Sequence, residues 1–375
     1  MSVTIRKVES EKDLKAFIEY PNSLYKNIPQ YIPALYMDEH ATLDKNKNAS
    51  FDFCEADYFL AYKDGKLVGR VAAIINPRAN ATWNKKEVRF GWIDFIDDEE
   101  VSSALLQTVI DWGHERGAEE IAGPLGFTDF DPEGMLVEGF DRKGTLIAIY
   151  NHPYYMKHLE KAGYTKVVDW VEYLIKVPDE LPERLTRIAS IILEKNKLHV
   201  KKLTRKIIHD EGYGRKFFNL INETYCVLYG YSHLSDRQID QYVAQYLTFI
   251  NLDMVCFIEN EEGELVAAGV TMPSIADALK KCDGKLFPTG WFHLLRALGG
   301  SSDTLEMLLV AVKPEYQNKG VNAILFADLF PSMKRLGYKY AESNPELETN
   351  DKVQSQWTGF DFEQHKRRRI YGKKI

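Results

Sequence analysis

The feature that most constrains this fold is an order of sequence patterns that occurs twice along the chain. Each half begins with a strand pattern, continues through helical stretches and a hairpin, and ends with alternating strand and helix patterns. In the first half these patterns predict elements at residues 3–8, 11–45, 58–77, 88–96, the helix that follows "DDEE", 119–126, 154–164 and 167–177. In the second half they predict elements at residues 199–203, 206–224, 235–250, 254–273, 305–312, the helix to about 336, 338–344, 351–360 and 362–372.

The repeat is one of structure more than of letters, and it indicates that one α/β domain was duplicated. The polar stretch "PDELPERL" at 178–185 contains two prolines and separates the halves. We therefore expect an α/β protein with a mixed sheet in each of two tandem domains, residues 1–177 and 199–375, with a linker and first helix at 178–198.

Composition excludes several classes of function. A net charge of −7 offers no general attraction to nucleic acid or to an anionic membrane. The four cysteines lie far apart and form no CxxC pair, which argues against a zinc site and a disulfide framework. No apolar run approaches the length of a membrane span. We expect a cytoplasmic, metal-free protein that binds neither nucleic acid nor membrane.

The stretch "VAVKPEYQNKGVNAILFADLF" at 310–330 reads as a strand, a polar loop and an amphipathic helix. The first N–H groups of a helix have no internal partner, and the helix dipole adds partial positive charge there. A glycine such as Gly320 lets the backbone approach an anion closely. A plain strand-to-helix turn is the alternative for this loop.

These patterns together resemble the GNAT acyltransferase superfamily. The family signature after the fourth strand is Gln or Arg, two residues, Gly, one residue, then Gly or Ala. Here Gln317 and Gly320 match it, whereas Asn322 departs from it. The resemblance implies that acetyl-CoA or another acyl-CoA binds, with its pyrophosphate held by Gln317, Asn318, Lys319, Gly320, Val321 and Asn322. It also implies that strands four and five splay apart around the thioester, with backbone groups of Val310, Ala311 and Val312 on the pantetheine arm and the oxyanion.

A second family motif is Asn, two residues, a small residue, three more and a Tyr, shortly before Gly-Phe. Asn350, Val353, Trp357 and the pair Gly359-Phe360 fall near those places. By resemblance, Asn350 bonds the pantetheine arm. Trp357 replaces the Tyr that often reprotonates the leaving thiolate, and an indole cannot deliver that proton. Packing in the core is the alternative for Trp357.

The first half departs further from the family. Four acids, 97–100, stand where its phosphate loop would be, and they would repel a pyrophosphate. We interpret residues 1–177 as a degenerate copy, although Asn151 to Tyr164 still resembles the second motif. The insertion at 123–141 is a candidate acceptor loop, with a plain surface loop as the alternative.

The resemblance implies direct acyl transfer from CoA to an amine, with a small molecule or a peptide as acceptor. Glu306, an acid in an otherwise apolar strand, is the candidate base, and Glu342 is interpreted as an exposed strand end. Tyr316 and Tyr371 are candidate acids. We expect an N-acyltransferase, in the first instance an N-acetyltransferase, and the competing interpretation is a non-catalytic acyl-CoA-binding scaffold. The basic run 365–374 is expected at a solvated edge, and the aromatic stretch 287–300 is expected in the core.

Overall fold

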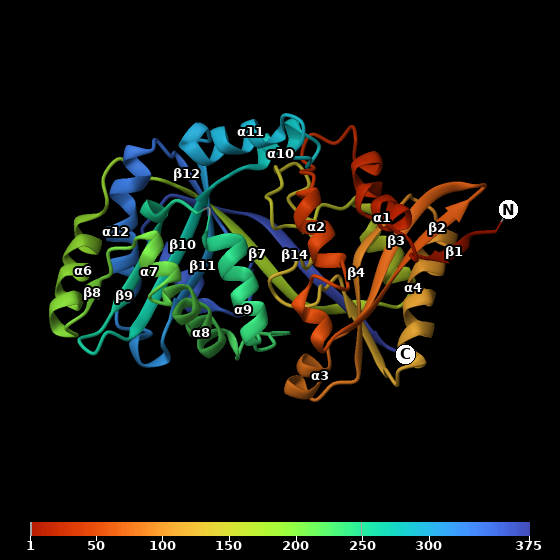
Figure 1. The fold of residues 1–375 in the computed structure, drawn as a ribbon, viewed down its shortest axis with the longest axis horizontal. Coiled ribbons are helices and arrows are strands. Elements are labelled where there is room, and N and C mark those ends of the chain that lie inside the picture. The colour runs from red at the N-terminus through yellow and green to blue at the C-terminus, as the bar shows by residue number, and fades with distance from the viewer. Residues whose placement is uncertain (1, 249) are drawn as a thin grey trace.

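The computed structural model of the chain describes residues 2–248 and 250–375. Its strands form one mixed sheet of 14 strands, with helices on both faces (Figure 1). The strand order is β1-β2-β3-β4-β5-β14-β7-β12-β11-β10-β9-β8, with β6 paired to β14 and β13 paired to β7. The expected α/β class with a mixed sheet is confirmed. Phe249, in the helical stretch expected at 235–250, lies outside the described residues.

The elements follow the predicted order in both halves. The strands are β1 Thr4–Lys7, β2 Glu55–Lys63, β3 Lys66–Ile75, β4 Glu87–Phe95, β5 Glu120–Gly123, β6 Met135–Glu138, β7 Thr165–Lys176, β8 His199–Val200, β9 Val255–Glu259, β10 Leu265–Pro273, β11 Thr304–Val312, β12 Tyr340–Ser343, β13 Glu346–Leu347 and β14 Phe362–Lys374. The helices are α1 Glu11–Leu24, α2 Tyr36–Leu43, α3 Pro77–Trp83, α4 Glu99–His114, α5 Tyr154–Lys161, α6 Glu183–Lys195, α7 Arg205–His209, α8 Tyr213–Tyr225, α9 Asp236–Tyr242, α10 Ala276–Lys281, α11 Gly290–Arg296, α12 Val321–Arg335 and α13 Asp351–Gln354.

Local sequence signals account for several of these boundaries. Ser10 accepts a hydrogen bond from the backbone of Asp13, whose side chain in turn accepts from the Ser10 backbone, and this capping box starts α1. Asp64 and Gly65 both have positive φ in the two-residue turn that joins β2 to β3. Asp98 caps α4 by accepting from the Glu100 N–H.

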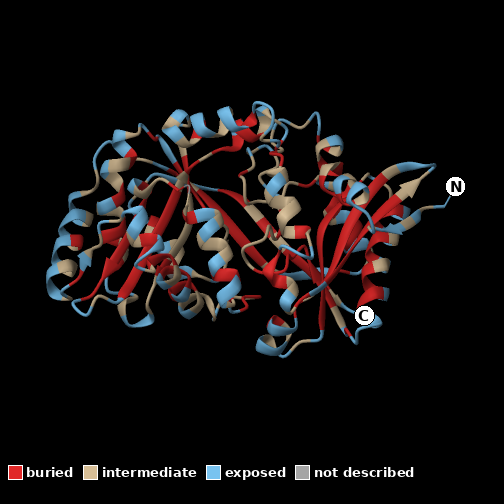
Figure 2. Cartoon of the chain, viewed as in Figure 1, coloured by how far each residue is buried: buried red, intermediate tan, exposed pale blue. Residues whose placement is uncertain are grey.

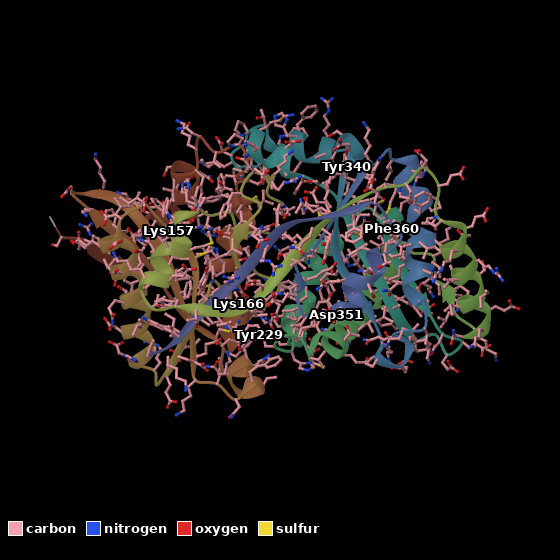
Figure 3. The ribbon with its side chains drawn as sticks, turned by 180° about the vertical axis from the view of Figure 1, so that it is seen from behind. Lys157, Lys166, Tyr229, Tyr340, Asp351 and Phe360 are labelled. Carbon is pink, nitrogen blue, oxygen red and sulfur yellow. The ribbon has the colours of Figure 1, made fainter. Side chains whose placement is uncertain are left out.

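The two halves exchange their last strands. β14, from the end of the chain, lies between β5 and β7 of the first half, and β7 lies between β14 and β12. The long antiparallel pair β7 and β14 crosses the middle of the molecule, as Figure 3 shows from behind. The sheet is therefore continuous across the duplicated units, and each half is completed by a strand of the other.

One face of this sheet carries α4 and α12, and we call it the α12 face. Val171 of β7 packs in the core beneath α12, and its ladder partner is Arg367 of β14. Alternation along β14 places Tyr371 on the same face, where it packs in the core beneath α4. The opposite face carries α1, α8, α10 and α11, and Figure 2 shows that most strand residues are buried between these layers.

Candidate active site

The second half contains an opening between two parallel strands. β11 and β12 pair from Thr304 with Tyr340 to Met307 with Ser343. β11 then continues to Val312, paired with β10 but no longer with β12. The register between β11 and β10 shifts at Leu308, which is an extra residue on β11. This bulge coincides with the point where the strands part, so β11 lacks a neighbour on one side beyond it. We call this opening the β11–β12 gap.

Backbone groups of β11 point into the gap. The Lys313 N–H donates to the Val266 carbonyl of β10, and hydrogen-bonded pairs alternate along an antiparallel ladder. Leu309 and Ala311 therefore bond to β10, whereas Val310 and Val312 direct their N–H and C=O groups toward the missing strand. Val310, Ala311 and Val312 were expected to contact a pantetheine arm through their backbone groups. The backbone groups of Ala311 point away from the gap, toward β10.

Side chains take up the two carbonyl groups. The Tyr225 hydroxyl donates to the Val310 carbonyl at 2.9 Å, and the Gln317 amide donates to the Val312 carbonyl at 3.0 Å. The N–H groups of Val310 and Val312 remain as donors that face the gap. Burial raises the pKa of Tyr225 to about 12, so its hydroxyl stays protonated.

Asn344, which directly follows β12, closes one end of the gap. Its side-chain amide donates to the Leu308 carbonyl at 2.6 Å. Its Oδ1 is buried and has no hydrogen-bond partner among the described residues. A buried acceptor without a partner is costly, so Asn344 Oδ1 marks a place for a donor from a ligand. The sequence interpretation missed this residue in favour of Asn350, although its place at a strand end is a usable signal.

The predicted phosphate loop lies at the far end of the gap. Gly320 has φ +82° and is the N-cap of α12, so the first N–H groups of the helix face outward from this loop. Asn318, Lys319 and Gly320 are exposed, and Val321 is buried. A Cβ atom at Gly320 would meet Ile188 of α6 at 3.1 Å, so α6 walls one side of the loop.

Two polar side chains of the loop are engaged within the protein. Gln317 reaches back to Val312, as described, and the Asn322 amide donates to Gln356 at 3.2 Å. The Lys319 ammonium lies 5.6 Å from the centre of the Tyr316 ring. The arrangement leaves an exposed helix N-terminus with one nearby cation, which is a geometry suited to an anion.

Glu306 lies on β11 two residues before the bulge, opposite Glu342 of β12. It is buried, and neither carboxylate oxygen has a partner in hydrogen-bonding geometry within the described chain. Burial raises the pKa of Glu306 to about 7, the charge of Glu342 adds to the rise, and nearby Ser274 opposes it. This carboxyl can therefore both accept and release a proton near neutral pH.

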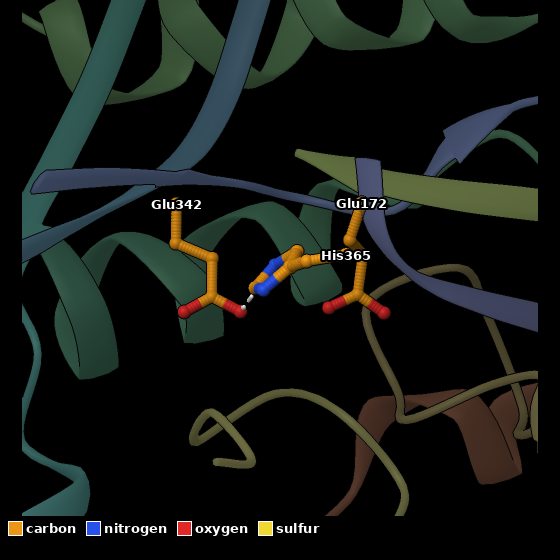
Figure 4. A group of neighbouring side chains, drawn as sticks. All are labelled: Glu172, Glu342 and His365. Carbon is orange, nitrogen blue, oxygen red and sulfur yellow. Dashed lines mark ion pairs between the residues drawn. The ribbon is translucent and has the colours of Figure 1, made fainter. Parts of the chain in front are cut away.

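Glu342, the ladder partner of Glu306, belongs to a buried cluster with Glu172 and His365 (Figure 4). Lys366 forms ion pairs with Glu342 and Glu172, and the Arg368 Nε donates to the Glu172 carboxylate at 2.5 Å. Burial alone would raise the pKa of Glu342, but His365 and Lys366 bring it below its usual range. The expectation of an exposed strand end for Glu342 is therefore wrong.

The basic run 365–374 lies in the middle of the sheet and not at a solvated edge. Lys366 and Arg368 are buried because β14 is a central strand, and the sequence does not show the exchange that makes it one. Ligand atoms of Glu172, Glu342 and His365 lie within 4.8 Å of one another, which is a spacing that a metal ion could use. Lys366 and Arg368 already neutralise the two carboxylates, so the charge of this cluster is balanced by the protein itself.

Trp357 and Glu346 form a second polar pair at the gap. Trp357 is buried on the α12 face, beside Phe326, and its indole N–H donates to Glu346 Oε1 at 3.1 Å. Glu346 Oε2 is buried without a hydrogen-bond partner among the described residues, and burial raises the pKa of this carboxyl to about 7. Glu346 lies two residues after Asn344 and pairs with Val171 of β7. Sequence reasoning did not single out Glu346.

Tyr371 does not lie with these residues, and the Asn350 side chain is engaged in a helix cap. Asn350 is the N-cap of α13 and accepts from the Val353 N–H at 3.4 Å. Tyr371 is paired with Gly123 and Lys166 in the first half, where its hydroxyl donates to Glu160 at 3.4 Å. The strand exchange carries Tyr371 away from the β11–β12 gap. Lys166 and Asp351 are labelled in Figure 3.

The first half lacks the anion loop but has a cavity at its own strand opening. Lys63 pairs with Asp98 and Glu100, so part of the acidic loop is neutralised within the protein. The cavity has a volume of about 90 Å³. Its lining includes the buried ion pair between Arg70 and Asp94, the carboxyl group of Glu39, and several tyrosines and apolar residues, among them Tyr25, Tyr31, Ile32, Trp92, Leu146, Ile149 and Tyr150.

The insertion at 123–141 packs between the halves. Phe130 stacks on Tyr242 and contacts Phe218 of the second half, and residues 123–128 are buried. Burial raises the pKa of Asp131 to about 7 and that of Asp129 to about 6. The alternative of a plain surface loop is therefore wrong for this segment.

Comparison with known proteins places this geometry in a class. No protein-family model matches the sequence. The solved structure of a tandem GNAT protein from the clavulanic acid biosynthesis pathway superposes with a TM-score of 0.57 at 8% identity, covering 100% of this chain and 98% of that one. The chain therefore has the GNAT superfamily fold, with tandem domains.

Two curated proteins are similar to this chain in sequence. Protein YghO of Escherichia coli strain K12 is 28% identical over 380 residues, covering 99% of this chain and 95% of its own. The bacterial ceramide synthase of Caulobacter vibrioides is 26% identical over 353 residues, covering 92% of this chain and 90% of its own. Both alignments span nearly the whole of each chain.

Proposed function

We propose that this protein is an acyl-CoA-dependent N-acyltransferase that moves an acyl group directly from the thioester to an amine. The observation that carries the proposal is Glu306, a buried carboxyl with a pKa of about 7 beside the β11–β12 gap, for which the described residues supply no partner in hydrogen-bonding geometry. A general base works best when its pKa lies near the operating pH, and burial supplies that shift here.

The acyl-CoA would lie along the gap. The loop 317–322 would hold the pyrophosphate at the N-terminus of α12, and Gly320 allows the close approach. The Val310 and Val312 N–H groups would bond the pantetheine arm and the thioester oxygen, and Asn344 Oδ1 would accept from a pantetheine amide. These donors and the buried acceptor match the amide and carbonyl groups of such a ligand.

The reaction would then need two proton transfers. The lone pair of the amine nitrogen attacks the thioester carbon, and Glu306 takes a proton from that nitrogen. The Val310 N–H stabilises the oxyanion as the C–S bond breaks. Glu346, which accepts a hydrogen bond from the Trp357 indole, gives its proton to the departing sulfur. Glu346 thus takes the role of the family's tyrosine, whose place in the motif is occupied by Trp357. The products are the amide and free coenzyme A.

The acceptor in this proposal is the amine of a largely apolar molecule. A ceramide is an amide of a long-chain amino alcohol, so the name of the Caulobacter relative denotes the same type of bond. The cavity in the first half, walled by tyrosines and aliphatic side chains, is suited to an apolar molecule with polar groups. Leu146 links this cavity to Met272, the ladder neighbour of Glu306.

A non-catalytic acyl-CoA-binding protein is the second candidate. Trp357 favours it, because this residue stands where the family usually has its acid and packs as a core aromatic residue.

The test is release of free thiol from acetyl-CoA and palmitoyl-CoA with a panel of amines, with the amide identified by mass spectrometry. The panel contains a long-chain amino alcohol, a polyamine, an amino sugar and a peptide. We expect an amide with the parent, only a small residual activity with Glu306→Gln, and intermediate activity with Glu306→Asp. Binding of acyl-CoA without product for any amine would support the second candidate.

A further inference from the structure

A patch of exposed apolar side chains covers the outer side of α11. Its members are Phe287, Trp291, Phe292 and Leu295, which are 74%, 48%, 54% and 61% exposed. We call these four residues the α11 patch. The aromatic stretch 287–300 was expected in the core, and for these four residues that expectation is wrong. Figure 2 shows exposed residues along α11, which lies at the upper border of the molecule in Figure 1.

The helix beneath the patch is anchored, because its inner side is apolar as well. Leu294 and Leu298 pack against a core that contains Ile275 and Leu279 of the α10 region. A surface helix normally has an apolar inner side and a polar outer side, whereas α11 has large apolar side chains on both. The outer side of α11 is therefore a surface that a partner would cover.

The charge around the patch differs from that of the rest of the chain. Residues 280–300 contain Lys280, Lys281, Lys285 and Arg296 against one acid, Asp283, so their formal net charge is 4 − 1 = +3. The whole chain carries −7, which leaves −10 for the remainder. Lys281 and Arg296 are exposed, whereas Lys285 forms an ion pair with Glu19 and Lys280 donates to the Pro29 carbonyl. Cations beside exposed Trp, Phe and Leu side chains are the composition of a helix that lies at a membrane interface.

The patch also lies close to the cavity of the first half. The core beneath α11 includes Ile32 and Leu146, and both residues line that cavity. Met272 belongs to the same core and is the ladder neighbour of Glu306. A molecule that leaves a membrane at α11 would thus be near both the cavity and the β11–β12 gap.

We propose that the α11 patch docks the protein on the surface of an anionic lipid bilayer. The helix lies in the plane of the interface, with the four apolar side chains at the boundary of head groups and acyl chains and the nearby cations toward anionic head groups. No helix in the described chain is long and apolar enough to cross a bilayer, so the contact is peripheral. This surface contact departs from the expectation, drawn from net charge, of no membrane partner. The inference does not depend on acyl transfer.

Flotation of the full chain with vesicles tests this proposal. The vesicles are phosphatidylcholine alone and phosphatidylcholine mixed with phosphatidylglycerol. We expect the parent to float with the mixed vesicles and Trp291→Ser/Phe292→Ser/Leu295→Ser to bind them about 100-fold more weakly. Lys281→Gln/Arg296→Gln is expected to bind about tenfold more weakly than the parent.

A matched control removes exposed apolar side chains elsewhere. Met37, Ile191 and Val227 are 53%, 48% and 76% exposed, and their triple change to Ser is expected to leave flotation unchanged. Absence of parent binding, or equal loss in the control, would overturn the proposal. Light scattering that shows a dimer abolished only by the patch variant, without vesicle binding, would assign the patch to a second copy and also overturn it.

Discussion

The Asn344 side-chain amide bonds the Leu308 carbonyl at 2.6 Å across the point where β11 and β12 part. Leu308 is the bulge residue of β11, and Asn344 is the first residue after β12. This one contact fixes the width of the gap at its closed end. It also leaves Asn344 Oδ1 buried and free to accept from a ligand.

Asn344→Ala is expected to weaken acyl-CoA binding about fivefold to tenfold, because one hydrogen bond and the fixed edge of the gap are lost. The rate at saturating acyl-CoA should change less. Asn350→Ala is the control, because the Asn350 side chain is engaged in capping α13, and its loss should affect stability by about 1 kcal/mol without changing acyl-CoA affinity. Weaker acyl-CoA binding by Asn350→Ala and unchanged binding by Asn344→Ala would support the role in pantetheine binding that the sequence motif implied for Asn350.

The dependence of kcat/KM on pH should be bell-shaped, with a narrow maximum near neutral pH. Activity rises as Glu306 loses its proton and falls as Glu346 loses its own, and both pKa values are about 7. The pH profile of the residual activity should lack its rising limb in Glu306→Gln and its falling limb in Glu346→Gln. A profile that both variants leave unchanged would contradict these two roles.

Stability should fall as pH rises from about 4.5 to about 7. The folded protein keeps the Glu306 proton up to about pH 7, whereas the unfolded chain loses it near the usual value of 4.5. The folded state therefore binds more protons in this window, and raising the pH through it destabilises the fold. At pH 8, Glu306→Gln should be more stable than the parent, by an amount on the order of 3 kcal/mol.

Thermal unfolding at pH 5 and pH 8 measures this effect. The gain of Glu306→Gln should be present at pH 8 and small at pH 5. Glu119→Gln removes an exposed carboxyl that pairs with Lys86 at the surface, and it should leave the unfolding temperature unchanged at both pH values. An equal gain at both pH values would show that Glu306 is ionised in the folded protein.

The strand exchange predicts that residues 1–177 do not fold alone. Without β14, the edges of β5 and β7 are unpaired and Glu172 loses both Lys366 and Arg368. Circular dichroism and gel filtration of this fragment should show an aggregated or unfolded chain. Co-expression with residues 178–375 should restore a soluble complex. A cooperative, monomeric 1–177 fragment would contradict the exchange.

Local patterns made much of this fold predictable. The alternation in β2 and β3, the Asp64-Gly65 turn and the loop before α12 each follow from neighbouring residues. The repeat of element order then indicated two related units. The exchange of β7 and β14 was not predictable, because either arrangement pairs the same strand sequences and only the contacts between halves choose one.

The site was predictable only where its residues are close in sequence. Glu306 stood out as an acid in an apolar strand, and Gly320 as a glycine before a helix. The prediction of Tyr371 as a residue of the site was wrong, because β14 pairs with strands of the first half and carries Tyr371 there. Glu346 carried no local signal, since its burial arises from contact with Trp357, eleven residues later. A single departure from the family motif, Trp for Tyr, was the one hint of that pair.

Calorimetric titration of the full chain with coenzyme A tests whether the β11–β12 gap is a coenzyme A site. The parent should bind, and Gly320→Glu should bind at least about 100-fold more weakly, because a carboxylate would stand at the anion site. Gly320→Ala adds the strain of a side chain at φ +82° and the 3.1 Å contact with Ile188 but no charge, and it should lose less. Gly263→Glu, at φ +73° in an open turn, should bind like the parent. No binding by the parent, or equal affinity for Gly320→Glu and Gly263→Glu, would contradict a coenzyme A site in the β11–β12 gap.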